Sequence, residues 1–369
     1  MDLSKAFDTI DHDILIYKLK RYGIQGLALS WIMDYLHNRK QYVTFQSSES
    51  SKSNITCGVP QGSILGPLLF LIYINDIIYS SPLLSFILFA DDTNIFYSHK
   101  NFGTLINVLN IEISKVSHWF LCNKLSLNIS KTNFIRFKPH NSLNVNPTNY
   151  NICINGHPIV EKRSTKFLGI TIDSNLSWSE HLHHVHISVS RGIGVLYRLK
   201  NLISQKSLTI LYNALVLPYI TYCNIVWGNC GSTKTNSILI LQKRALRLIT
   251  NSHYRSHSDP LFSQLKTLKI HDIHTFQTAI FMYKYSRNQL PSVFDNFCIP
   301  NSNIHSYPTR RSSDYHLENP RIVLAQKSLK HHGPDVWNSL PDIIKQCDTI
   351  SLFKKHLKDS ILSQYLSDD

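Results

Sequence analysis

The chain has 369 residues, 43% of them hydrophobic, so it can bury a large core and has the length of about two or three domains. Its 38 Lys and Arg residues outnumber its 24 Asp and Glu residues. The resulting net charge of +14 indicates a polyanionic partner, either nucleic acid or an anionic membrane surface. Seven scattered cysteines without a C-x-x-C pair exclude the small disulfide-rich secreted proteins and argue against a zinc knuckle.

The apolar stretches predict neither a signal peptide nor a membrane span. Residues 1–20 are charged throughout, unlike a signal peptide. The longest apolar stretch, 64–74, is too short to span a bilayer. We therefore expect an intracellular protein of the cytoplasm and nucleus, and we expect no membrane partner.

The spacing of apolar residues predicts a mixture of helices and strands. Between residues 14 and 35 the spacing is helical, with a break near Gly23 and Gly26, which predicts two helices. Strands are predicted at 41–46, 152–154 and 167–172. Further helices are predicted at 64–74, 105–123, 179–203, 206–228, 233–250, 260–287, 320–330 and 349–366.

A constrained loop precedes the apolar helix at 64–74. Gly58, Pro60 and Gly62 bracket Gln61, whose amide can hydrogen-bond the edge of a base or a sugar. Glycines let the backbone approach a ligand closely. An ordinary Gly-Pro turn ahead of a core helix is the alternative interpretation.

Two adjacent carboxylates interrupt the apolar stretch 85–98. The runs 86–89 and 95–97 predict the two arms of a β-hairpin with Asp91 and Asp92 at its tip. Adjacent carboxylates repel each other unless a cation neutralises them, and Mg²⁺ binds through one or two carboxylates together with substrate phosphates. The alternative is a solvated turn, in which Asp is common.

The positive charge is concentrated in residues 141–250, which hold 11 basic and 3 acidic side chains. Glu180 is the last acidic residue of this span, so the basic side chains of the predicted helices have few partners. We favour a helical bundle that faces nucleic acid over a merely solvated face. Its cations are Arg191, Arg198, Lys200, Lys206, Lys243, Arg244 and Arg247.

Several motifs stand in one order along the chain: Asp2 with Phe7, the loop 58–63, and 89–92 with its two aspartates. They continue through 127–132, 167–169 and the Trp-Asn-Ser-Leu-Pro string at 337–341, which is followed by Phe353-Lys354. This ordered set resembles the reverse transcriptases of non-LTR retrotransposons of the jockey-like and chicken-repeat-like kind.

The resemblance implies an α+β fold. Residues 1–175 would form a polymerase-type palm, an antiparallel sheet with helices, and 176–250 a helical thumb. Residues 251–369 would form a helical C-terminal region of unknown role. In this family a fingers region precedes the first aspartate, so we expect an N-terminally truncated polymerase.

The resemblance also implies a two-metal nucleotidyl transfer. Asp2 and Asp91 would bind two Mg²⁺ ions, or Mn²⁺, with Asp92 beside them. The chain would add a dNTP to the 3′-hydroxyl of a DNA primer on an RNA template.

The remaining roles follow from the same resemblance. Phe7 would stack under the sugar and exclude a 2′-hydroxyl, or serve as a core aromatic. Gln61 and Gly62 would line the nucleotide pocket, and Lys131 would protonate the leaving pyrophosphate or lie on the surface. Binding of the primer and of the nucleic-acid backbone would fall to Lys166, Phe167, Leu168, Gly169, Arg191, Arg198, Lys200, Lys243, Arg244 and Arg247.

Two other classes of function compete with a polymerase. The first is a catalytically idle, nucleic-acid-binding remnant of a retrotransposon, whose binding would survive loss of Asp91. The second is a nuclease or phosphatase built on an aspartate cluster, which needs a further Glu, Asp or His ligand that the sequence does not offer convincingly.

Overall fold

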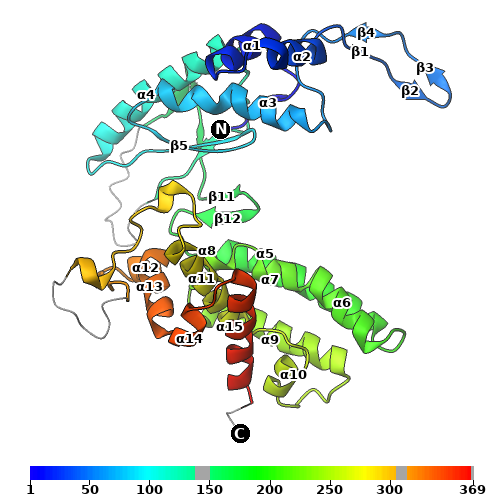
Figure 1. Ribbon diagram of the computed structural model, residues 1–369, viewed down its shortest axis with the longest axis vertical. Coiled ribbons are helices and arrows are strands. Elements are labelled where there is room, and N and C mark those ends of the chain that lie inside the picture. The colour runs from blue at the N-terminus through cyan, green and yellow to red at the C-terminus, as the bar shows by residue number, and fades with distance from the viewer. Residues whose placement is uncertain (138–149, 305–313, 367–369) are drawn as a thin grey trace. The chain divides into compact units, whose positions relative to one another are not determined.

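The computed structural model describes residues 1–137, 150–304 and 314–366 and divides into two compact units, Met1–Arg163 and Ser164–Asp369 (Figure 1). Both units combine helices with small sheets, as the coarse fold prediction requires. In the described part of the chain, no helix is long and apolar enough to cross a membrane.

The described part of the first unit contains four α-helices, and they confirm the helices predicted there. Asp11 caps the first of them by accepting a hydrogen bond from the Ile14 amide at 3.0 Å. A 3₁₀-helix, η1 (Asn75–Ser80), continues directly from the third. The α-helices are α1 (His12–Arg21), α2 (Gly26–Leu36), α3 (Leu65–Ile74) and α4 (Phe102–Cys122).

The predicted aspartate hairpin is confirmed. Strands β5 (Ser85–Phe89) and β6 (Asp92–Phe96) pair antiparallel, with Phe89 opposite Asp92. The apolar side chains of this hairpin share one core with α1, α3 and α4, and these helices gather on one side of it (Figure 1).

The single strand predicted at 41–46 is wrong. An exposed arm replaces it, in which β1 (Lys40–Gln41) pairs with β4 (Ser53–Asn54) and β2 (Thr44–Phe45) with β3 (Ser48–Glu49) (Figure 1). The chain folds back within this stretch, where Gln46 and Ser47 both adopt positive φ. Alternation alone therefore overestimated the length of the strand.

Two further strand pairs complete the first unit. Strand β8 (Cys153–Ile154), within the predicted strand 152–154, pairs antiparallel with β9 (His157–Pro158). Strands β7 (Asn133–Phe134) and β10 (Val160–Glu161) run parallel.

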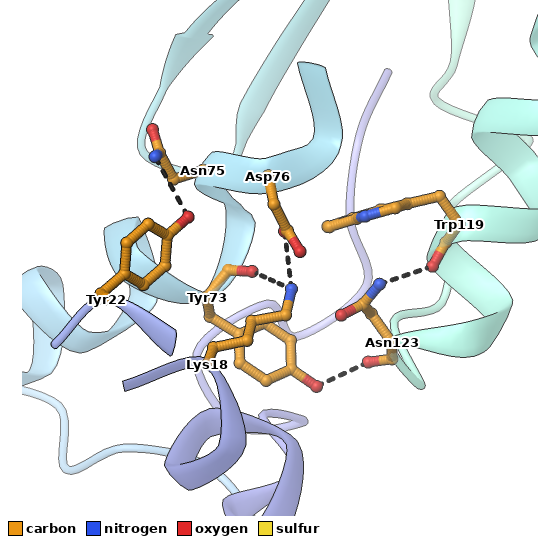
Figure 2. Close-up of polar contacts among 7 residues, drawn as sticks. All are labelled: Lys18, Tyr22, Tyr73, Asn75, Asp76, Trp119 and Asn123. Carbon is orange, nitrogen blue, oxygen red and sulfur yellow. Dashed lines mark hydrogen bonds and ion pairs between the residues drawn. The ribbon is translucent and has the colours of Figure 1, made fainter. Parts of the chain in front are cut away.

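A buried lysine of α1, Lys18, contacts three other helical elements of the first unit, α3, η1 and α4 (Figure 2). The ammonium group of Lys18 donates to the carbonyl oxygen of Tyr73 at 2.6 Å and to the Asp76 carboxylate at 2.7 Å. It also lies 4.8 Å from the ring centroids of Tyr73 and Trp119. Burial lowers the pKa of Lys18, although the bond to Asp76 opposes the shift. The charge is tolerated because every neighbour compensates it.

The second unit begins with a hairpin, so the single strand predicted at 167–172 is wrong. Strands β11 (Ser164–Phe167) and β12 (Ile170–Asp173) pair antiparallel around a turn at Leu168 and Gly169. Both turn residues have positive φ, +43° and +86°, as a two-residue hairpin turn requires.

Helices form the rest of the second unit. Residues 206–228 form three helices rather than one, because Pro218 and the left-handed Cys223 interrupt the pattern. Residues 260–287 likewise divide at Lys266. The helices are α5 (Ser179–Leu199), α6 (Gln205–Leu215), α7 (Leu217–Thr221), α8 (Asn224–Trp227), α9 (Ser232–Thr250), α10 (Asp259–Gln264) and α11 (Ile270–Ser286).

The last part of the chain is helical as predicted, with different boundaries. The Trp337 string lies largely inside a helix that buries Trp337, and the helix predicted at 320–330 is interrupted at Lys327 and Ser328. These elements are η2 (Ser292–Phe294), η3 (Asn301–Asn303), α12 (Val323–Gln326), α13 (Leu329–Ser339), α14 (Asp342–Lys345) and α15 (Ile350–Gln364).

Candidate active site

The segment that carries Asp2 is held on both sides. The Met1 nitrogen donates to the Thr93 carbonyl oxygen of β6 at 2.6 Å. On the other side, the Asn128 amide donates to the Asp2 carbonyl oxygen and the Ser4 amide to that of Ser126, each at 2.9 Å. Asp2 therefore lies in an extended segment between the aspartate hairpin and residues 126–128.

The turn of the aspartate hairpin consists of Ala90 and Asp91. Ala90 has φ +50°, a left-handed conformation that costs an L-residue about 1–2 kcal/mol. Strain of this kind persists where the surrounding structure requires it, and it is common at functional sites. Asp91 is half-buried in the turn, and Asp92 is exposed as the first residue of β6.

The charges of Asp92 and Asp2 both affect the amino group of Met1. Burial lowers the pKa of the Met1 amino group, whereas the charges of Asp92 and then Asp2 raise it. Both carboxylates therefore favour a positive charge at the nitrogen they share. Among the residues that the structure describes, no three His, Cys, Asp or Glu side chains form a metal cluster. Carboxylate oxygens are ligands of hard divalent cations, so the chemistry of Asp2, Asp91 and Asp92 fits a divalent cation.

The loop 58–63, called the glycine loop below, packs against the turn that follows Phe7. The Val59 amide donates to the Phe7 carbonyl oxygen at 2.8 Å, and the Gly58 amide to that of Ile10 at 2.7 Å. Gly58 has φ +87°, and a Cβ added there would lie 2.7 Å from the Asp8 carbonyl oxygen. Only glycine allows this approach.

Gln61 has a partner that sequence reasoning did not identify. Its side-chain amide donates to the Asp8 carboxylate at 2.7 Å. Asp8 was visible in the sequence only as one of several irregularly spaced aspartates, so no local signal distinguished it. Gly62, at φ +82°, is exposed beside Gln61 with open space around its Cα.

Phe7 and Lys131 lie close to this loop and to Asp2, respectively. The Phe7 ring packs 4.6 Å from that of Phe70 and borders the core, which agrees with its alternative role as a core aromatic. The Lys131 ammonium lies 3.8 Å from the Asp2 carboxylate, with 71% of its side chain exposed. The roles predicted for both residues in catalysis stay predictions.

The residues predicted to steady the primer lie in the second unit, on the β11–β12 hairpin. Lys166 is exposed on β11, and Phe167 pairs with Ile170. The Tyr222 hydroxyl donates to the Leu168 carbonyl oxygen at 2.6 Å and so holds the turn. Sequence reasoning missed Tyr222 because it is 54 residues away in the chain.

The seven predicted cations of the helical bundle lie on α5, α6 and α9 or directly after α5, and they divide into two groups. Lys200, Arg244 and Arg247 line one pocket. The other four, Arg191, Arg198, Lys206 and Lys243, lie outside its lining.

Comparison with known proteins identifies the class. Residues 1–172 match the family described as reverse transcriptase (RNA-dependent DNA polymerase). This stretch includes the aspartate hairpin, the glycine loop and the Asp2 segment, so residues 1–172 are similar to a reverse transcriptase domain, as the sequence motifs predicted.

The similarity extends beyond this domain to polymerases of mobile elements in Drosophila melanogaster. The chain is 26% identical to the RNA-directed DNA polymerase from mobile element jockey over 282 residues, which is 74% of this chain and 30% of that protein. It is 26% identical to the probable RNA-directed DNA polymerase from transposon X-element over 281 residues, 74% of this chain and 30% of that protein. The corresponding protein from transposon BS is 27% identical over 299 residues, 76% of this chain and 31% of that protein. The chain therefore spans about 30% of the length of the curated relatives it matches.

Proposed function

We propose that the chain supplies the palm and thumb of an RNA-directed DNA polymerase of a mobile element. The reaction would transfer a nucleotide from a dNTP to a primer 3′-hydroxyl on an RNA template. The observation that carries the proposal is the position of residues 1–4, whose backbone hydrogen bonds hold Asp2 beside β6. These residues lie in the stretch that matches the reverse transcriptase family. Residues 1–175 would form the palm and 176–250 the thumb.

The proposed chemistry rests mainly on positioning and on neutralising charge. Divalent cations, Mg²⁺ in the first place, would neutralise the triphosphate and favour ionisation of the 3′-hydroxyl when bound. Asp2 and Asp91 would hold them, with Asp92 beside, because these carboxylates are acceptor-only and at least partly accessible. Lys131, which lies close to Asp2, would pass a proton to the leaving pyrophosphate.

Substrate positioning would fall to both units. Phe7 would exclude a 2′-hydroxyl from beneath the incoming sugar, and Gln61 with Gly62 would line the nucleotide pocket. The turn at 167–169 with Lys166 would steady the primer end. The cations of α5 and α9, Arg191, Arg198, Lys200, Lys243, Arg244 and Arg247, would follow the duplex backbone without reading sequence.

Incorporation of dNTPs by the purified chain on an RNA template with a DNA primer and Mg²⁺ tests the proposal. Loss of a residue that only orients a metal ligand lowers activity roughly 10–100-fold. Because Asp91 would bind the metal directly, Asp91→Asn should reduce dNTP incorporation by more than this. Asp34→Asn, which changes an exposed carboxylate on α2, is the matched control and should leave incorporation unchanged.

The same assay separates the polymerase from its main rival. An Asp91→Asn variant as active as the unchanged chain would contradict the catalytic assignment. If neither protein incorporates dNTPs while both bind the duplex with strong salt dependence, the chain is an idle nucleic-acid-binding remnant.

A further inference from the structure

A pocket of about 460 Å³ lies where the end of α5 meets the second half of α9 and the loop that follows it. This volume falls within the roughly 300–1,000 Å³ of small-molecule sites. Ile240 and Leu248 of α9 contribute apolar walls. The pocket lies entirely within the second unit.

The pocket is strongly positive. Lys200, Arg244 and Arg247 line it, and no carboxylate does. Residues 174–258 hold nine Lys and Arg residues and a single acidic one, Glu180, which lies in the first turn of α5. An anion that enters the pocket therefore meets three cationic side chains and no carboxylate in the lining.

The cations of the pocket differ in what they already bind. The Arg247 guanidinium donates to the Ser256 carbonyl oxygen through Nε at 3.0 Å and through Nη2 at 2.9 Å, so part of it shapes the loop. Arg244 is exposed and has no hydrogen bond or ion pair within the described part of the chain. Its planar, five-donor group is suited to a phosphate.

Two exposed tyrosines flank these cations. Tyr197 is 56% exposed, and the Lys200 ammonium lies 5.1 Å from its ring centroid. Tyr254 is 67% exposed, and the Arg255 guanidinium lies 5.2 Å from its ring centroid. Both tyrosines line the pocket together with its three cations, whereas Arg255 lies outside its lining. The pocket therefore combines aromatic rings with basic groups, the combination by which proteins bind single-stranded nucleic acid.

The loop that presents Tyr254 is ordered by its own contacts. Asn251 ends α9 with φ +51°, and the Ser252 amide donates back to the Arg247 carbonyl oxygen at 3.0 Å. The hydroxyls of Thr250 and Ser252 lie 2.8 Å apart. A stacking residue on an ordered loop loses little conformational entropy on binding.

We propose that this pocket binds an unpaired nucleotide of a single-stranded nucleic acid. Its base would stack on Tyr254 or Tyr197, and its phosphate would contact Arg244 and Lys200. Paired bases are already stacked inside a duplex, so backbone contacts to a duplex would use the cations but not the tyrosine rings. The inference shares its nucleic-acid partner and the cations Lys200 and Arg244 with the proposed function, but it needs neither dNTP nor metal.

Fluorescence anisotropy with the full chain tests the pocket. Labelled oligo-U and oligo-dT of about 12 nucleotides, within the usual site sizes, are compared with a blunt RNA/DNA duplex, in EDTA and without dNTP. Tyr254→Ala should weaken single-strand binding about tenfold, the loss expected for one stacked base, and leave duplex binding unchanged. Tyr254→Phe should retain full affinity because the ring stays. Preference for oligo-U or oligo-dT identifies RNA or DNA as the natural strand.

Further variants separate stacking from charge and from misfolding. Arg244→Gln should weaken the binding of both the single strand and the duplex. It should also reduce the slope of log binding constant against log salt concentration by about one. Tyr197→Ala provides a second test of stacking, and Tyr79→Ala, an exposed tyrosine of the first unit, should change nothing. Equal losses for single strand and duplex, or failure of Tyr254→Phe to retain affinity, would overturn the inference. If the unchanged chain incorporates no dNTP but Tyr254→Ala still weakens single-strand binding, the proposed function is rejected and the inference about the pocket is retained.

Discussion

Gly58 and Gly62 occupy one loop, both in the left-handed region, yet their surroundings differ. At Gly58 the Asp8 backbone fills the space that a side chain would need, whereas nothing lies within 4 Å of a Cβ at Gly62. The sequence identified the loop from its glycines and Pro60. Only the folded chain distinguishes a glycine required by close backbone approach from one required by φ alone.

Gly58→Ala should destabilise the first unit by about 3 kcal/mol, the sum of left-handed strain and steric overlap with backbone that cannot move away. Gly62→Ala, the matched control, should cost only about 1 kcal/mol because strain acts alone. Urea unfolding of the two variants measures the difference. Equal destabilisation by both substitutions would show that the Asp8 contact carries no energy.

Gln61 illustrates the limit of reading single residues. Its position between glycines indicated a functional loop, but its hydrogen bond is to Asp8, which lies 53 positions earlier in the chain. Asp2 illustrates the converse. Its surroundings depend on backbone bonds to β6 and to residues 126–128, which no periodicity of the sequence describes.

Helix α11 carries a buried histidine whose titration should control the stability of the second unit. The Nδ1 of His274 donates a hydrogen bond to the Asn224 carbonyl oxygen at 3.1 Å. Its Nε2 is buried without a partner among the described residues. The pKa of His274 is lowered to about 4, mainly by burial; the hydrogen bond to Asn224 opposes the shift, and the nearby His332 and His271 contribute to it. His332 stacks on the ring at 5.2 Å.

The second unit should lose stability as the pH falls from about 6.5 towards 4. In this window the unfolded chain binds a proton at His274 and the folded chain does not, so acid favours unfolding. One pKa unit corresponds to about 1.4 kcal/mol, so the loss from this residue reaches roughly 3 kcal/mol. Urea unfolding as a function of pH measures it.

The matched variants compare slopes rather than absolute stabilities. His274→Gln should flatten the pH dependence between 4 and 6.5, whatever its own cost in packing. His183→Gln changes an exposed histidine of α5 and should preserve the slope. If His274→Gln leaves the slope unchanged, the acid sensitivity belongs to another group, such as the buried His181 or the half-buried His271.

One hydrophobic core runs through the second unit, on both sides of residue 250. The buried Gln242 of α9 connects the two parts: its amide donates to the Leu268 carbonyl oxygen at 2.8 Å and accepts from the Ile270 amide at 3.1 Å. The helices expected to form the thumb and those of the C-terminal region therefore share one interior, and helices α10, α11, α13 and α15 help to hold α5 and α9 in place.

Phe353→Ala should test this shared core. Phe353 is fully buried on α15 and stacks on Tyr283 at 4.5 Å, so its removal should cost about 3–5 kcal/mol. Hydrogen exchange should then lose protection together in α15, α5 and α9. Leu352→Ala, at the exposed neighbouring position, is the control. Unchanged protection in α5 and α9 would mean that the two parts unfold separately.

The sequence by itself determined the class of this protein, because its motifs are short, local and ordered along the chain. It also determined most helices and the aspartate hairpin, since these depend on periodicities of a few residues. The tertiary structure alone decided which residues meet. The pairing of Asp8 with Gln61, the support of the Leu168 turn by Tyr222 and the shared core across residue 250 join distant segments. Such contacts depend on how the elements pack, which local patterns do not encode.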